Sequence, residues 1–330
     1  MINYLKEYAD LSFDEYPFNS VDSLILSQLS YIQFEKSEID IESNKHYLSD
    51  FYDELDTITS STRVPEENKD LYLELIHSLR FENISISNFV YNFDIDNEKQ
   101  FCAMTFHLPQ HIDYIAFRGT DATIIGWKED LNLSFSQDIP SQKSALNYVN
   151  MYNEKNTLLL GGHSKGANLA TYAGLYTKKS IQAIYNHDGP AFLKPIQNIN
   201  SVPIMKTIPQ SSVIGLLMEQ DTSYQVIQSS AHGILQHDPF TWNVDNGEFI
   251  YLDNIDNFAK TIQKLVQKIL DSSSAQTRQI LINSVFEVLL DTDASTFKEI
   301  EVLKLIKSVK NLDEQTKKEL ISLLKKEESN

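Results

Sequence analysis

Cysteine, long apolar runs and basic residues are all scarce in this chain of 330 residues. Its single cysteine, Cys102, excludes a disulfide within the chain and predicts a reducing compartment. The sequence holds no run of about 18 apolar residues, so it predicts no transmembrane helix. The first residues lack a basic start followed by an apolar core, and we therefore expect no signal peptide and a cytoplasmic protein.

The scarcity of positive charge bears on the partners of the protein. The 28 lysine and arginine residues face 46 aspartate and glutamate residues, which gives a formal net charge of −18. A surface this acidic repels nucleic-acid phosphates, so we expect no nucleic-acid partner. No predicted helix carries two histidines four residues apart with a nearby acid, and the sequence has no phosphate-binding glycine-rich loop. It therefore predicts neither a metal ion nor a cofactor.

The motif Gly-His-Ser-Lys-Gly at residues 162–166 is the most informative pattern present. It follows the apolar run 157–161 and precedes the alanine-rich segment 167–173, which predicts a strand, a tight turn and a helix. The two glycines suit a turn so sharp that any Cβ would collide with the neighbouring strand or helix. The serine between them is forced into a strained backbone geometry that exposes its hydroxyl. The motif thus predicts Ser164 as a nucleophile.

The apolar pattern divides the chain into three regions. Residues 1–98 predict mainly helices that pack on a sheet or cover its mouth. Residues 99–255 alternate strands with helices, which predicts an α/β core with a mainly parallel sheet. Residues 256–330 predict a helical region without catalytic residues. Within the core we expect strands at 101–107, 112–117, 181–186, 203–208 and 213–218, and a helix at 144–152.

A serine nucleophile needs a base and donors for the oxyanion that forms. We expect the first donor to be the backbone N–H of Lys165, directly after the serine. A second donor is expected from the loop 117–120, where Gly119 allows close approach and Thr120 offers an N–H and a hydroxyl. The Lys165 cation opposes the dipole of the helix that it begins. Its side chain can bind an acidic group or extend to solvent, and we favour solvent.

Four segments together resemble the class 3 (fungal-type) lipases and a related bacterial lipase-like family of unknown function, both within the α/β hydrolases. They are Phe-Arg-Gly-Thr at 117–120, Trp127 with Asp130 and Leu131, the serine motif at 162–166, and the stretch from Gln236 to Trp242. The resemblance covers roughly residues 100 to 250. It implies an α/β-hydrolase fold, an ester or lipid substrate, and a role for Thr120 in the oxyanion hole.

Three histidines follow the nucleophile and are candidates for the base: His187, His232 and His237. His237 lies in a loop-like stretch before Phe240, where the lipase pattern places its catalytic histidine, so the resemblance favours His237. We expect His163, which directly precedes the serine, to have a structural role instead.

Several residues are candidates for the acid that orients this base. Class 3 lipases carry it after the strand that matches residues 203–208, but serines stand there in this chain. Asp188 is favoured in its place, because it lies 24 residues after Ser164, at the end of the next strand, where some other lipases carry their acid. Asp221 is the alternative, and Asp238 or the lack of any acid also stays open.

The sequence thus predicts a serine hydrolase that cleaves carboxylic esters, lipid esters among them, through an acyl-enzyme on Ser164. The alternative is a protein of α/β-hydrolase shape that binds a ligand or partner without turnover, since the acid is displaced and the periphery is helical. The sequence does not separate ester cleavage from thioester or amide cleavage.

Overall fold

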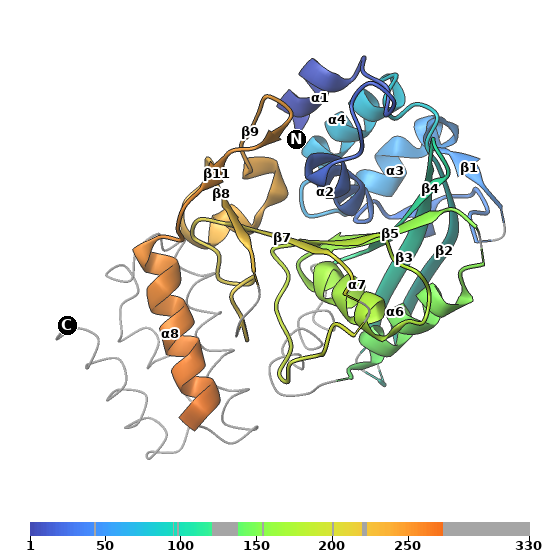
Figure 1. The fold of residues 1–330 in the computed structure, drawn as a ribbon. Coiled ribbons are helices and arrows are strands. Elements are labelled where there is room, and N and C mark those ends of the chain that lie inside the picture. The colour runs from blue at the N-terminus through green and yellow to red at the C-terminus, as the bar shows by residue number, and fades with distance from the viewer. Residues whose placement is uncertain are drawn as a thin grey trace.

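A nine-stranded sheet forms the centre of the protein (Figure 1). The computed structural model describes residues 1–272 except 43, 95, 98, 121–137, 154, 200 and 220–222. The strands follow one another across the sheet in chain order. They are β1 (His46–Tyr47), β2 (Ser85–Asp94), β3 (Lys99–Leu108), β4 (Ile112–Phe117), β5 (Thr157–His163), β6 (Ala183–His187), β7 (Ile204–Pro209), β8 (Gln225–Ile227) and β11 (Tyr251–Leu252).

The middle of the sheet is parallel and its margins are antiparallel. Strands β4 to β8 run parallel to one another, and β1 to β4 and β8 with β11 pair antiparallel. Helical crossovers join β4 to β5 and β5 to β6, as parallel neighbours require. The carboxyl ends of the five parallel strands consequently meet at one edge. The predicted α/β-hydrolase-like sheet covered by helices is confirmed, with antiparallel strands added on both sides.

Helices cover both faces of this sheet, as Figure 1 shows, with the N-terminal helices on one face and α6 and α7 on the other. Strand β4 alternates between the two cores: Tyr114 packs with the N-terminal helices, and Ile115 packs with α6 and α7. The helices are α1 (Ile2–Tyr8), α2 (Ser20–Leu29), α3 (Leu55–Thr59), α4 (Pro65–Ile76), α6 (Pro140–Met151), α7 (Lys165–Tyr176) and α8 (Asn257–Ser272). Short 3₁₀ turns are η1 (Phe34–Lys36), η2 (Leu48–Glu54), η3 (Gly233–His237) and η4 (Pro239–Thr241). Strands β9 (Val244–Asp245) and β10 (Glu248–Phe249) form a separate pair.

Two segments differ from the sequence-based expectation. Residues 85–94, within the region expected to be mainly helical, form β2 and pair with β3. A register shift between Ser87 and Val90 breaks the two-residue alternation there, which removes the pattern that identifies a strand. Residues 213–218, expected as a strand, form turns. They curl round the end of β6, where Gly215 N donates to the Asp188 carboxylate (3.1 Å).

The C-terminal region is described only as far as α8, whose Ala259 packs in a small core with Ile208 and Val226. The rest of the predicted C-terminal helical region lies outside the described residues. Among the described helices, none combines the length and the apolar character that crossing a membrane requires.

Candidate active site

The turn between β5 and α7 has the sharp geometry that the serine motif predicts. Ser164 adopts φ 58° and ψ −130°, in the positive-φ region that strains a non-glycine residue. A Cβ on Gly162 would lie 2.6 Å from Gly166 O, and one on Gly166 would lie 2.9 Å from the carbonyl carbon of Phe117. Side chains at these two positions are thus excluded by backbone atoms.

Hydrogen bonds hold the backbone of this turn and leave the serine side chain available. Ser164 N donates to His187 O at the end of β6 (3.0 Å). The side chain of Ser164 lies at a half-buried position, and among the described residues its hydroxyl has no hydrogen-bond partner. Within the described part of the chain, no hydrogen bond thus holds this hydroxyl in place.

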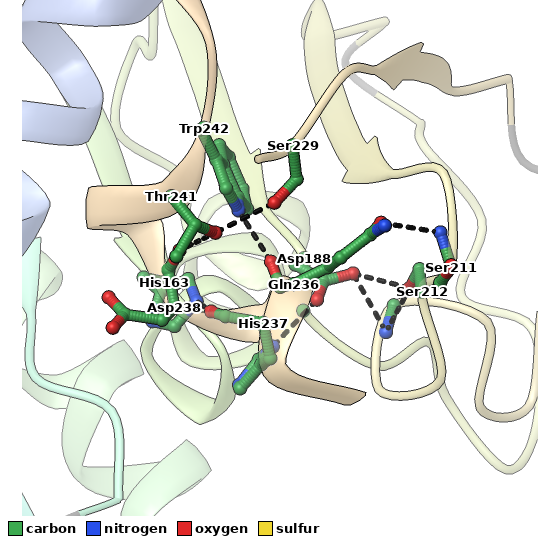
Figure 2. Close-up of polar contacts among 12 residues, drawn as sticks. His163, Asp188, Ser211, Ser212, Ser229, Gln236, His237, Asp238, Thr241 and Trp242 are labelled. Carbon is green, nitrogen blue, oxygen red and sulfur yellow. Dashed lines mark hydrogen bonds and ion pairs between the residues drawn. The ribbon is translucent and has the colours of Figure 1, made fainter. Parts of the chain in front are cut away.

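The acid and the base favoured by the sequence analysis are in contact. His237, the last residue of η3, has its Nδ1 2.6 Å from Asp188 Oδ2. Figure 2 shows this contact continuing to Ser212, whose Oγ donates to Asp188 Oδ1 (2.5 Å). The Asp188 side chain is fully buried, and that of His237 is 16% exposed. The carboxylate of Asp188 accepts from its neighbours, so His237 Nδ1 donates to it, and Nε2 is the ring nitrogen that remains to accept a proton.

His163 ties the turn to the loop that carries His237. Its Nε2 lies 2.9 Å from His237 O, its Nδ1 lies 3.1 Å from Tyr31 Oη, and the two imidazole rings are 4.4 Å apart. Burial, and next the nearby His237, hold the pKa of His163 well below its usual range, so the ring is neutral. A carbonyl only accepts, so Nε2 donates to it and Nδ1 accepts from Tyr31. This arrangement gives His163 the structural position expected of it, beside Ser164.

The other candidates for base and acid are placed differently. His187 is buried, with its Nε2 2.9 Å from Ser23 Oγ and its Nδ1 2.8 Å from Thr207 Oγ1, and burial lowers its pKa to about 3. His232 is exposed and precedes η3. Asp238 caps η4 by accepting from Phe240 N (3.0 Å). Asp221 lies outside the described residues.

The end of β4 reaches the serine turn at the place expected for the second oxyanion donor. A Cβ on Gly119 would lie 2.8 Å from His163 O, so the Gly119 backbone packs directly against the turn. The preceding Arg118 is buried, and it donates to Ser30 O (2.5 Å) and Ile32 O (2.6 Å) after α2. These bonds fix the segment that leads to Thr120. Trp127, Asp130 and Leu131 of the resemblance lie outside the described residues.

The Lys165 side chain does not reach solvent, and that expectation is wrong. It is 1% exposed, and its Nζ donates to Gln100 O (3.1 Å) and Gln100 Oε1 (3.0 Å) at the start of β3. The first three turns of α7 are buried throughout, from Lys165 to Gly174, so the side chain has no path to solvent.

Sequence reasoning missed three residues that support this site: Tyr31, Ser212 and Gly215. No local pattern marks Tyr31, because it comes from the N-terminal helical region and meets His163 only through the fold. A signal for Ser212 was present, since it stands where the lipase pattern carries its acid. Within the described part of the chain, no group of three histidine, cysteine, aspartate or glutamate residues could hold a metal ion.

Comparisons with known proteins were made for sequence and for structure. No curated protein sequence matches the chain. Among solved structures, the Rhizomucor miehei lipase–propeptide complex is 14% identical, with a TM-score of 0.40 and 73% of each chain covered. Lipase II from Rhizopus niveus is 12% identical, with a TM-score of 0.37 and coverage of 69% of this chain and 81% of that one. Lip2 lipase from Yarrowia lipolytica is 7% identical, with a TM-score of 0.39 and coverage of 74% and 86%. The Mbeg1-like family matches residues 75–287, which is more than half of the sequence. The chain therefore belongs to the Mbeg1-like family.

Proposed function

We propose that this protein is a serine hydrolase that cleaves carboxylic esters through an acyl-enzyme on Ser164. The observation that carries the proposal is the contact between His237 and the buried Asp188, which directly follows the residue that accepts from Ser164 N in the strained turn. His237 serves as the general base and Asp188 as the acid that orients it. His163 supports this assignment, because it binds the backbone of His237 and directly precedes Ser164.

In the proposed reaction, Ser164 Oγ attacks the carbonyl carbon of the ester and its proton passes to His237 Nε2. The oxyanion accepts hydrogen bonds from the Lys165 N–H and from Thr120. The carbon–oxygen bond to the alcohol then breaks, and the alcohol leaves with the proton from His237. Water repeats the same steps on the acyl-enzyme, which releases the acid and restores Ser164.

The substrate class follows from the sequence resemblance of segments 117–120 and 162–166, which favours carboxylic esters, lipid esters among them. We further propose a reducing compartment such as the cytoplasm, on the basis of the single cysteine. The three-part division at residues 98 and 255 is retained as a proposal, with Tyr31 as the contribution of the first region to the site.

Labelling with a fluorophosphonate probe tests the proposal. Trypsin cleaves after Lys155 and Lys165, so a label on Ser164 appears in the peptide of residues 156–165. Ser164→Ala should remove this label and abolish turnover of short p-nitrophenyl esters, with an unchanged circular dichroism spectrum. Ser144→Ala, at another half-buried serine, is the matched control and should change neither.

The alternative, a protein that binds without turnover, predicts the opposite result. A folded wild-type protein with no label in the peptide of residues 156–165 would refute the hydrolase proposal and support the alternative. Turnover near the wild-type rate in Ser164→Ala would move the nucleophile to another residue.

A further inference from the structure

A second set of serine, histidine and aspartate side chains lies on strands β2, β3 and β4. Ser87 Oγ is 2.7 Å from His107 Nε2, and His107 Nδ1 is 2.8 Å from Asp113 Oδ1. The strand register explains the arrangement. Asp113 on β4 lies directly opposite His107 on β3. On the other side of β3, Ser85 on β2 lies opposite His107, and Ser87 is two residues further along β2. Both hydrogen bonds of a serine–histidine–aspartate relay are thus formed here.

This cluster lies at the other end of the sheet from Ser164. Asp113 is the second residue of β4 and pairs with Leu158, the second residue of β5. Ser164 follows the last residue of β5. Because β4 and β5 are parallel, the cluster belongs to their amino ends and the candidate active site to their carboxyl ends. The two sets of residues are therefore independent.

The hydrogen bonds around Asp113 decide where the protons are. Its Oδ2 accepts from Tyr152 Oη (2.6 Å) and Asn156 Nδ2 (3.1 Å). Burial opposes ionisation of Asp113, but the bonds from His107, Tyr152 and Asn156 outweigh it and lower the pKa of the carboxyl. Asp113 is thus a carboxylate that only accepts, so His107 Nδ1 donates to it. The other ring nitrogen of His107, Nε2, then accepts from the Ser87 hydroxyl, as that of a general base does.

Ser87 lies on β2 beyond the two residues at which β1 pairs with that strand. Strand β1 pairs with β2 only at Ser85 and Ile86 within the described residues, so β2 is an edge strand from Ser87 onward. Ser87 is half-buried, and the next residue, Asn88, is exposed with φ 53° at the register shift. Asn88 Nδ2 donates to Ser87 Oγ (3.0 Å). The same amide is a donor for an oxygen of a group added to Ser87.

We propose that Ser87 is a second nucleophile, with His107 as its base and Asp113 as the residue that orients His107, and that it accepts acyl and phosphonyl groups from small activated donors. With a fluorophosphonate, the Ser87 oxygen bonds to phosphorus, the phosphorus–fluorine bond breaks, and fluoride leaves. The hydroxyl proton passes to His107 Nε2. With an aryl ester, the oxygen bonds to the acyl carbon, and the phenol leaves with that proton. This proposal does not rest on the proposed function of Ser164.

The test is fluorophosphonate labelling of the full-length Ser164→Ala variant. Trypsin cleaves after Arg80 and Lys99, so a label on Ser87 appears in the peptide of residues 81–99, separate from that of residues 156–165. We expect the first peptide to carry label in Ser164→Ala and to lose it when Ser87→Ala is added. Adding His107→Gln should slow labelling about 10²-fold, the lower range for loss of a general base. Adding Ser144→Ala instead should change nothing.

Three results would overturn the proposal. The first is a folded Ser164→Ala protein, shown by circular dichroism, whose peptide of residues 81–99 stays unlabelled. The second is label in that peptide after Ser87→Ala is added, which would move the acceptor to Ser85 or Tyr91 of the same peptide. The third is a labelling rate unchanged by His107→Gln, which would make Ser87 an ordinary serine. His107 is preferred to Asp113 for this variant, because its side chain is 11% exposed and that of Asp113 is fully buried.

Discussion

The amide variant of Asp188 tests the proposed triad most sharply, because its hydrogen bonds determine how the new side chain must lie. Asp188 Oδ1 accepts from two donors, Ser212 Oγ (2.5 Å) and Gly215 N (3.1 Å). In Asp188→Asn the amide oxygen therefore takes the Oδ1 position, since the amide NH₂ has no lone pair for these donors. The NH₂ group then occupies the Oδ2 position, facing His237 Nδ1.

This orientation reverses the tautomer of His237. An NH₂ group donates, so Nδ1 becomes the acceptor and the ring proton moves to Nε2. The nitrogen that should receive the proton of Ser164 is then already protonated, while the shape of the site is unchanged. Loss of the correct tautomer in a serine triad lowers kcat about 10⁴-fold. At 1.36 kcal/mol for each factor of ten, the transition state loses about 5 kcal/mol of stabilisation.

The assay is kcat and KM for a short p-nitrophenyl ester at neutral pH, with urea unfolding to verify the fold. Asp238→Asn is the matched control. It neutralises the carboxylate of Asp238, which directly follows His237 and caps η4. We expect this control to keep its rate within about threefold, since the asparagine amide oxygen still accepts from Phe240 N and Asn caps a helix about as well as Asp. An Asp188→Asn enzyme within tenfold of the wild-type rate would refute the tautomer argument. A large loss in Asp221→Asn instead would transfer the role to Asp221.

Three further predictions test other parts of the structure. Thr120→Val keeps shape and backbone N–H, and we expect kcat to fall about 10²-fold with KM little changed, whereas an effect on KM alone would make Thr120 a substrate contact. Gly166→Ala puts a Cβ against the Phe117 backbone and should lower the unfolding free energy by about 3 kcal/mol in urea. Gly174→Ala, whose Cβ meets the side chains of Ile184 and Leu160 instead of backbone atoms, should cost less. Burial lowers the pKa of His187 to about 3, from 6.5 in the unfolded chain. The unfolded state thus binds the extra proton, and stability should fall by about 1.4 kcal/mol per unit as pH drops from 6.5 toward 3. His187→Asn should remove this component from the slope of unfolding free energy against pH, and an unchanged slope would contradict the reasoning.

The serine turn could be predicted from the sequence because its cause is local. Two glycines at fixed distance from Ser164, an apolar run before them and alanines after them are all properties of one short segment. The structure shows the same backbone contacts that exclude a Cβ at Gly162 and Gly166. Local sterics of this kind leave a direct pattern in the residues, independent of the rest of the fold.

The surroundings of Lys165 could not be predicted in this way. The helix dipole and a flexible stem favour solvent for a lysine at a helix start. The observed burial depends on Gln100, which lies 65 residues earlier in the chain and meets Lys165 only after β3 has joined the sheet. Strand β2 was missed for a different reason. Its alternation of buried and exposed residues is broken where the register shifts after Ser87.

The proposed acid lies where the carboxyl ends of two neighbouring strands, β6 and β7, come side by side. The lipase pattern leads one to expect an acid after the strand that became β7, and the chain has Ser212 there. Asp188 follows the adjacent strand β6, and its carboxylate is 2.5 Å from the Ser212 hydroxyl. Carboxyl ends of neighbouring parallel strands lie side by side, so an acid can move from one to the other and still reach the same imidazole. A residue-by-residue comparison sees only that an acid is missing after β7. In the sheet, the serine in that place donates to Asp188, the proposed acid, which follows the adjacent strand β6.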